Sequence, residues 1–149
     1  MAPRPDYRTY ERRLMGGHSG DSLAGIRYML QYAFSAPTFR QFWQRWNPLF
    51  SYYLLFFGYA NLKRALPRIL AVPITFSLSG SVHDLAVGVL VGKWQLLFTG
   101  VFAGFGIWVM LEEWLGIRLP AGTDRWRWLY HLGLMALILF SGHWVRAMV

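Results

Sequence analysis

With 149 residues, of which 55% are hydrophobic and 18% aromatic, the chain has more apolar side-chain area than a soluble domain of this length usually buries. Its net charge of +8 suits the anionic face of a membrane, and because long apolar runs are present we expect membrane lipids, not nucleic acid, as partners. The absence of cysteine excludes disulfides, thiolate nucleophiles and cysteine-based metal sites.

The first third of the chain is basic and rich in aromatic residues. Its start carries several arginines and no apolar run, so it predicts neither a cleavable signal peptide nor a span. Ser22 can cap a helix that runs through Tyr32, and Pro37 then forces a break. A second short helix is predicted from Thr38 to Trp46. These patterns divide the chain into three segments. Residues 1–22 are a polar basic segment, residues 23–67 form interfacial helices, and residues 68–149 form a transmembrane helical domain.

Three later stretches have the length and apolarity of membrane spans, at about 68–92, 94–115 and 128–145. Asp84 is the acid inside the first stretch. Glu112 and Glu113 come only in the last turn of the second, where lipid headgroups could solvate them. Small residues at four-residue spacing, such as Gly100 and Gly104, predict close helix packing. The fold class is therefore an all-α integral membrane protein.

The apolar run at about 46–62 is short and has basic residues on both sides. We interpret it as interfacial or re-entrant, with a tilted fourth span as the alternative. Basic residues are most frequent before Arg68, so the positive-inside rule predicts a cytoplasmic N-terminus, in a bacterial inner membrane or an organellar membrane.

His83 and Asp84 lie near the middle of the first predicted span, where ionisable groups are expensive and usually functional. On a helix, His83 shares a face with Phe76 and Ser79, whereas Asp84 lies over Gly80 and other small residues. A desolvated imidazole is a competent general base, and Asp84 could tune it. The alternative is a polar pair that only fixes helix packing.

A second cluster, FRQFWQRWNP at 39–48, interleaves aromatic and basic residues. Trp43 and Trp46 lie on one helical face, with Arg40, Arg45 and Asn47 between or beside them. Arginine forks bind phosphate oxygens and tryptophan packs on apolar groups, so the cluster suits a phosphate-bearing amphiphile. An amphipathic helix that anchors the chain at the interface is the alternative.

The order of two motifs, FWQRWNPLF at 42–50 and FSLSGSVHDL at 76–85, resembles the membrane-bound O-acyltransferase family, closest to its wax synthase and sterol or diacylglycerol acyltransferase branches. The resemblance covers about residues 40–91. It implies that His83 is the catalytic base on an acceptor hydroxyl, with Asn47 as the second polar site residue and Asp84 beside the base. It further implies that Trp43, Arg45 and Trp46 frame the substrate together with Arg40. The co-substrate would be acyl-CoA or another acyl thioester, with no metal or other cofactor.

Members of this family have many more transmembrane helices, which wall the reaction chamber. A chain this short is expected either to complete its chamber in a homo-oligomer or larger membrane complex, or to serve there as a non-catalytic subunit that contacts lipid or pigment. A third idea takes His83, His131 and His143 as metal, haem or pigment ligands. Their scattered positions have no ligand spacing, so we expect no metal site.

Overall fold

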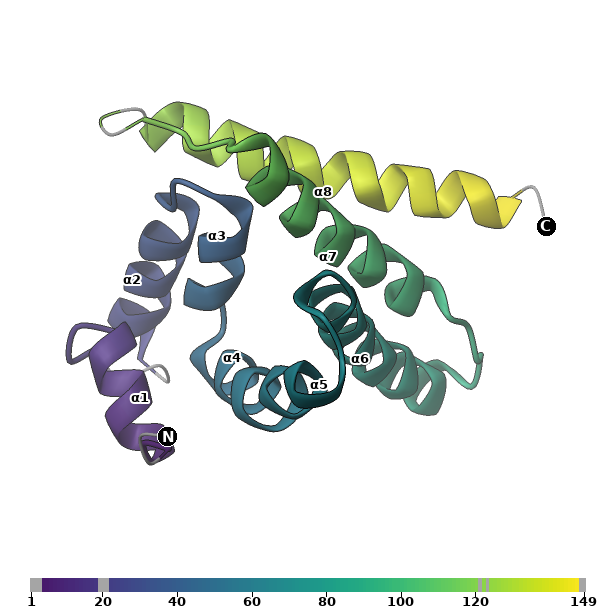
Figure 1. Cartoon of the computed structure of the whole chain (residues 1–149), viewed down its shortest axis with the longest axis horizontal. Coiled ribbons are helices and arrows are strands. Elements are labelled where there is room, and N and C mark those ends of the chain that lie inside the picture. The colour runs from purple at the N-terminus through teal and green to yellow at the C-terminus, as the bar shows by residue number, and fades with distance from the viewer. Residues whose placement is uncertain (1–3, 19–21, 121, 123, 148–149) are drawn as a thin grey trace.

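The computed structural model describes residues 4–18, 22–120, 122 and 124–147, with side chains described as far as residue 141. Every regular element in these residues is a helix, which confirms the all-helical prediction. In chain order they are α1 (Tyr7–Leu14), α2 (Leu23–Phe34), α3 (Phe39–Arg45), α4 (Pro48–Tyr53), the π-helix η1 (Leu54–Tyr59), α5 (Ala60–Ala65), α6 (Arg68–Val91), α7 (Leu97–Leu115) and α8 (Asp124–Ala147) (Figure 1).

The short N-terminal helices begin at side chains that accept hydrogen bonds from free backbone amides. The Ser22 hydroxyl accepts from the amide of Gly25 at 3.0 Å, and the Thr38 hydroxyl accepts from that of Gln41 at 3.1 Å. Both predicted helix starts are thereby confirmed. The sequence did not lead us to expect α1, where the Asp6 carboxylate accepts from the amide and hydroxyl of Thr9, which holds the pKa of Asp6 below its usual value.

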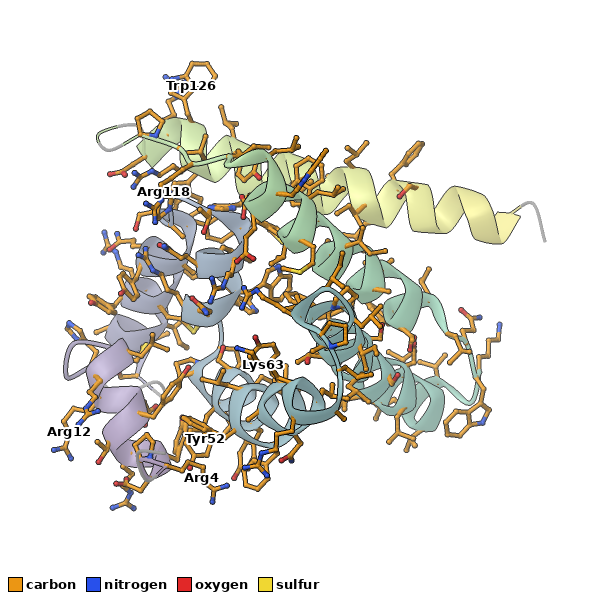
Figure 2. All side chains as sticks on the ribbon, in the orientation of Figure 1. Arg4, Arg12, Tyr52, Lys63, Arg118 and Trp126 are labelled. Carbon is orange, nitrogen blue, oxygen red and sulfur yellow. The ribbon has the colours of Figure 1, made fainter. Side chains whose placement is uncertain are left out.

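Of the segment predicted at 46–62, residues 48–62 are helical without a break, because α4, η1 and α5 follow one another directly. It packs on α1 through Tyr52, whose hydroxyl donates to the carbonyl of Pro5 at 2.9 Å. Figure 2 shows Tyr52 and Arg4 at the end of the molecule where α1 and α4 meet. In the described part of the chain this segment is not among the helices of spanning length, so its place at, in or across a membrane stays a prediction.

Helices α6 and α7 are long and apolar enough to cross a membrane. Only 28% of the most apolar window of α6 and 33% of that of α7 are buried, whereas the core helix of a soluble protein would be mostly buried. Large apolar side chains such as Leu85, Val89 and Leu90 are exposed on α6. A membrane location accounts for this exposure, because lipid would cover these side chains.

Glycines let α6 and α7 pack tightly against each other. A Cβ at Gly80 would lie 2.3 Å from the carbonyl oxygen of Phe98, and one at Gly106 would lie 2.6 Å from the Cα of Pro73. Gly100 and Gly104, the pair predicted to pack closely, do not lie between α6 and α7 in this way. Gly104 faces Ile138 of α8, and nothing lies within 4 Å of a Cβ built at Gly100.

Helix α8 covers the third predicted span and crosses α7 along the edge of the molecule (Figure 1). Of the three predicted spans, α6 and α7 satisfy the length and hydropathy of a spanning helix within the described residues; a membrane crossing by α8 stays a prediction. Near its start, His131 is fully buried among the rings of Phe34, Phe39 and Phe42, and its Nε2 donates to the carbonyl of Ala36 at 2.9 Å. This aromatic core fixes α2 and α3 against α7 and α8.

Candidate functional site

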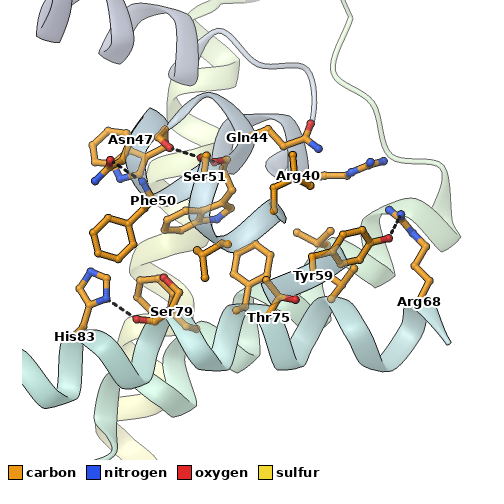
Figure 3. A pocket seen from close by; sticks show the side chains of 18 of the residues that line it. Arg40, Gln44, Asn47, Phe50, Ser51, Tyr59, Arg68, Thr75, Ser79 and His83 are labelled. Atoms are coloured by element: carbon orange, nitrogen blue, oxygen red, sulfur yellow. Dashed lines mark hydrogen bonds between the residues drawn. The ribbon is translucent and has the colours of Figure 1, made fainter. Parts of the chain in front are cut away.

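A cavity of about 250 Å³ lies between α3, α4 and η1 on one side and α6 on the other, with α7 behind it (Figure 3). Its walls are mostly apolar, and they include Leu54, Leu55, Val72, Phe76, Phe102 and Val109. Gln44, Ser51 and Thr75 are polar lining residues between its two ends, and the ends carry further polar side chains. We call the end with Asn47, Ser79 and His83 the histidine end and the end with Arg40, Tyr59 and Arg68 the arginine end. An apolar pocket with few polar groups is typical of a site for an amphiphilic ligand.

His83 is held in one orientation at the histidine end. Its Nδ1 lies 2.7 Å from the carbonyl oxygen of Ser79, one turn earlier in α6. A carbonyl only accepts hydrogen bonds, so Nδ1 carries a proton, and in the neutral ring the lone pair is then on Nε2. The rings of Phe50, Phe98 and Phe102 surround the imidazole at centroid distances of 5.8, 5.9 and 5.0 Å. The predicted face shared by His83, Ser79 and Phe76 is the face that lines the cavity.

Asn47 lines the cavity from the opposite wall and also begins α4. Its backbone has a positive φ of 44°, a conformation that asparagine tolerates better than most residues. The Asn47 Oδ1 accepts from the amide of Phe50 at 3.3 Å, which leaves the side-chain amide group outside this cap. In Figure 3 the ring of Phe50 lies between Asn47 and His83, so the two polar side chains share one cavity without touching.

Trp43 and Trp46 both line the cavity, Trp43 from α3 and Trp46 from the extended residue that follows it. Trp43 packs among the rings of Phe76 and Phe102 at centroid distances of 5.7 and 5.4 Å, and Trp46 stacks on Phe42 at 5.6 Å. Tyr10 reaches the same cavity from α1. Burial raises the pKa of Tyr10 above its usual value.

The arginine end combines a predicted residue with two that sequence analysis missed. The Glu113 carboxylate accepts from Arg40 Nη1 at 2.9 Å and from Arg68 Nη2 at 2.7 Å. The Arg68 Nη1 donates to the Tyr59 hydroxyl at 3.1 Å. The signal for Arg68 was present in the sequence, because the start of one spanning helix and the end of the next lie together in an antiparallel pair.

Two predicted site residues face elsewhere. The Asp84 carboxylate is buried against α7, where it accepts from the backbone amides of Phe98 at 2.9 Å and Thr99 at 2.7 Å and from the Thr99 hydroxyl at 2.6 Å. Its oxygens therefore cap the N-terminus of α7 and do not adjoin His83. Arg45 donates to the carbonyl of Tyr32 at 3.0 Å and lies over that residue's ring at 4.2 Å, away from the cavity.

Glu112 also differs from its prediction, because its side chain is inside the protein and not among lipid headgroups. The residue is 1% exposed. Its carboxylate accepts from the amides of Phe39 at 2.8 Å and Arg40 at 3.3 Å, and from the Tyr130 hydroxyl at 2.8 Å. Glu112 therefore caps α3, the helix that carries Arg40 and Trp43 into the cavity.

The histidines do not converge in the described residues, where no group of three or more His, Cys, Asp or Glu side chains could hold a metal ion. His83 lines the cavity, whereas His131 is buried in the aromatic core. The side chain of His143 lies outside the described residues, so a ligand role for it stays untested.

Comparison with protein-family models, curated proteins and solved structures finds no match to this chain. The resemblance to membrane-bound O-acyltransferases is therefore carried by the residues of the two motifs alone.

Proposed function

We propose that this chain is a compact membrane acyltransferase of the membrane-bound O-acyltransferase type, which moves an acyl chain from a thioester to a lipid or other alcohol. One observation carries the proposal. His83 and Asn47 come from motifs 36 residues apart in the sequence, and both line one apolar cavity. The contact of His83 Nδ1 with Ser79 further supports a basic Nε2.

In the proposed reaction, His83 Nε2 takes the proton of the acceptor hydroxyl while the hydroxyl oxygen attacks the thioester carbonyl carbon. The tetrahedral intermediate collapses, the carbon–sulfur bond breaks, and the leaving thiolate takes the proton back from Nε2. A positioned general base of this kind contributes a rate factor of about 10² to 10⁴. The side-chain amide of Asn47, the part outside its helix cap, is available to orient the acceptor or the thioester.

The remaining walls suit the other parts of the substrates. The apolar side chains of η1, α6 and α7 would accommodate the acyl chain and keep water from the thioester. Arg40 would bind the anionic part of the donor. Arg68 would take the role predicted for Arg45, because Arg68 lines the cavity and Arg45 contacts Tyr32. Asp84 has no part in the proposed chemistry, since its carboxylate caps α7.

The alternative, a non-catalytic subunit that scaffolds a larger membrane complex, draws support from the outer faces of the long helices. On α8, large apolar side chains such as Leu132, Leu137 and Phe140 are exposed by 48%, 65% and 62%. Partner helices could cover this face as readily as lipid. The cavity favours the enzyme, because a pure scaffold gains nothing from an open space beside a basic imidazole.

An acyl-transfer assay separates the two functions. Purified protein in lipid nanodiscs would be incubated with labelled long-chain acyl-CoA and a panel of lipid alcohols, for wild type, His83→Ala and His83→Gln. We expect ester product with the wild type and a loss of about 10² to 10⁴ in rate with both variants. His18→Ala is the matched control, because His18 is exposed and lies outside the cavity. Equal rates for wild type and His83→Ala would refute the catalytic assignment.

A further inference from the structure

The arginine end of the cavity carries a net positive charge. Two guanidinium groups, those of Arg40 and Arg68, share the single carboxylate of Glu113. Lys63 adds a further cation nearby, with its Nζ 6.0 Å from the centre of the Tyr59 ring. With Glu112 included, whose carboxylate accepts from the backbone amide of Arg40, three cationic side chains lie near two carboxylates, and the positive excess comes from Lys63.

The two arginines differ in how many of their donors are in use. All three guanidinium nitrogens of Arg68 donate, since Nε and Nη2 donate to Glu113 at 3.2 and 2.7 Å and Nη1 donates to Tyr59 at 3.1 Å. Arg40 uses Nη1 alone; within the described residues its Nε and Nη2 have no hydrogen-bond acceptor. The Tyr59 hydroxyl accepts from Arg68 and keeps its own proton to donate. Arg40 and Tyr59 thus offer unused donors to the same cavity.

This cluster lies at one end of the pair of spanning helices. Arg68 is the first residue of α6 and Glu113 is in the last turn of α7, so both belong at the level of the lipid headgroups if the pair crosses a membrane. His83 follows fifteen residues later in α6, about 22 Å away at a rise of ~1.5 Å per residue. Mostly apolar side chains line the space between the two ends, with Thr75 among them.

From this arrangement we infer that Arg40 and Tyr59, with Arg68 holding Tyr59 in place, bind the phosphate of a single-chain amphiphile whose chain extends through the cavity toward His83. The inference deepens the proposed function, because it sets the direction of the ligand, with the phosphate at the interface and the chain at the proposed base. Binding itself needs no acyl transfer.

Photo-crosslinking tests this site without turnover. The protein in zwitterionic nanodiscs would be incubated with dodecyl phosphate that carries a diazirine at the end of its chain, illuminated, digested and sequenced by mass spectrometry. We expect labels on residues of the cavity near His83, such as Ser79 and Phe102. Labels confined to the outward face of α6, at Leu85 or Val89 for example, would overturn the inference.

Competition and variants test the headgroup contacts. Unlabelled dodecyl phosphate should compete, whereas inorganic phosphate and dodecanol should compete at least tenfold less well, since each lacks one half of the ligand. Arg40→Gln should weaken labelling about tenfold or more and Tyr59→Phe by a smaller factor. Arg64→Gln is the matched control, because Arg64 is exposed at the end of α5 and does not line the cavity.

Two outcomes would contradict the headgroup assignment, namely equal labelling of wild type and Arg40→Gln, or full competition by inorganic phosphate alone. His83→Ala should label normally. Cavity labelling by a protein that shows no acyl transfer would keep the ligand site and reject the catalytic function. Acyl transfer without Arg40-dependent labelling would keep the catalytic function and reject the phosphate site.

Discussion

The side of α6 that faces the cavity and the side that packs on α7 use their polar residues differently. Toward the cavity, His83 lines an open space and uses Nδ1 for a hydrogen bond to the Ser79 carbonyl. Toward α7, Asp84 is buried and both of its oxygens are occupied by helix-start amides. Adjacent residues of an α-helix point about 100° apart, so neighbours in the sequence belong to separate regions. Function is therefore expected to depend on the first side and stability on the second.

The largest effect should come from His83→Ala, which removes the proposed base. Acyl transfer should fall by about 10² to 10⁴, while the thermal unfolding temperature in detergent changes little, because the imidazole borders an existing cavity. Tryptophan fluorescence during heating measures stability on the same sample that is assayed. A large drop in unfolding temperature would mean that His83 acts mainly in packing.

The opposite result is expected for Asp84→Ala. Two backbone amides and the Thr99 hydroxyl would lose their acceptor in a buried place, so the free energy of unfolding should fall by about 3 kcal/mol. Asp84→Asn keeps one acceptor oxygen and should lose about half as much. Asp124→Ala, at a side chain that is 70% exposed, serves as the control. If Asp84→Asn removed acyl transfer without loss of stability, the side of α6 that packs on α7 would serve function and not only stability, against our expectation.

A smaller effect should follow from Gly80→Ala on the same side. Its new Cβ would meet the Phe98 carbonyl, so α6 and α7 must move apart at a cost of about 2 kcal/mol. Gly100→Ala offers a matched comparison, because nothing lies within 4 Å of a Cβ there. That variant should be neutral or slightly stabilising in the same heating experiment. Equal behaviour of the two variants would show that α6 and α7 do not approach as closely as described.

The smallest effect is expected from Glu112→Gln, at the junction that holds α3. Glutamine keeps one oxygen for the amides of Phe39 and Arg40 and places a donor where the second oxygen was, so about 1 kcal/mol of stability should be lost. Because α3 carries Trp43, the apparent affinity for substrate should fall together with stability. Kinetics at several substrate concentrations test this, and a change in kcat alone would argue against a positioning role.

Local patterns in the sequence predicted the helix starts and the faces of α6, since these depend on residues a few positions apart. Ser22 caps a helix as expected, the second short helix begins at Thr38 as expected, and Ser79 lies on the same face as His83. The roles of Asp84 and Glu112 could not be predicted, because the amides they bind belong to helices 14 and 73 residues away along the chain. The contact of Arg68 with Glu113 could have been expected from the antiparallel pairing of two successive apolar helices, whereas that of Arg68 with Tyr59 became visible only in the packed structure.

The cap that Asp84 forms on α7 also bears on how the protein enters a membrane. An aspartate at the centre of an isolated span costs about 3 kcal/mol during insertion, and Asp84, seven residues before the end of α6, would bear part of that cost because no lipid group replaces its hydration. Both hydrogen-bonded partners of Asp84 are in the first turn of α7, so that cost is relieved once α7 stands beside α6. The two helices are therefore expected to leave the translocon as one hairpin. Helix α6 would stay in the translocon until α7 has been synthesised and packs beside it.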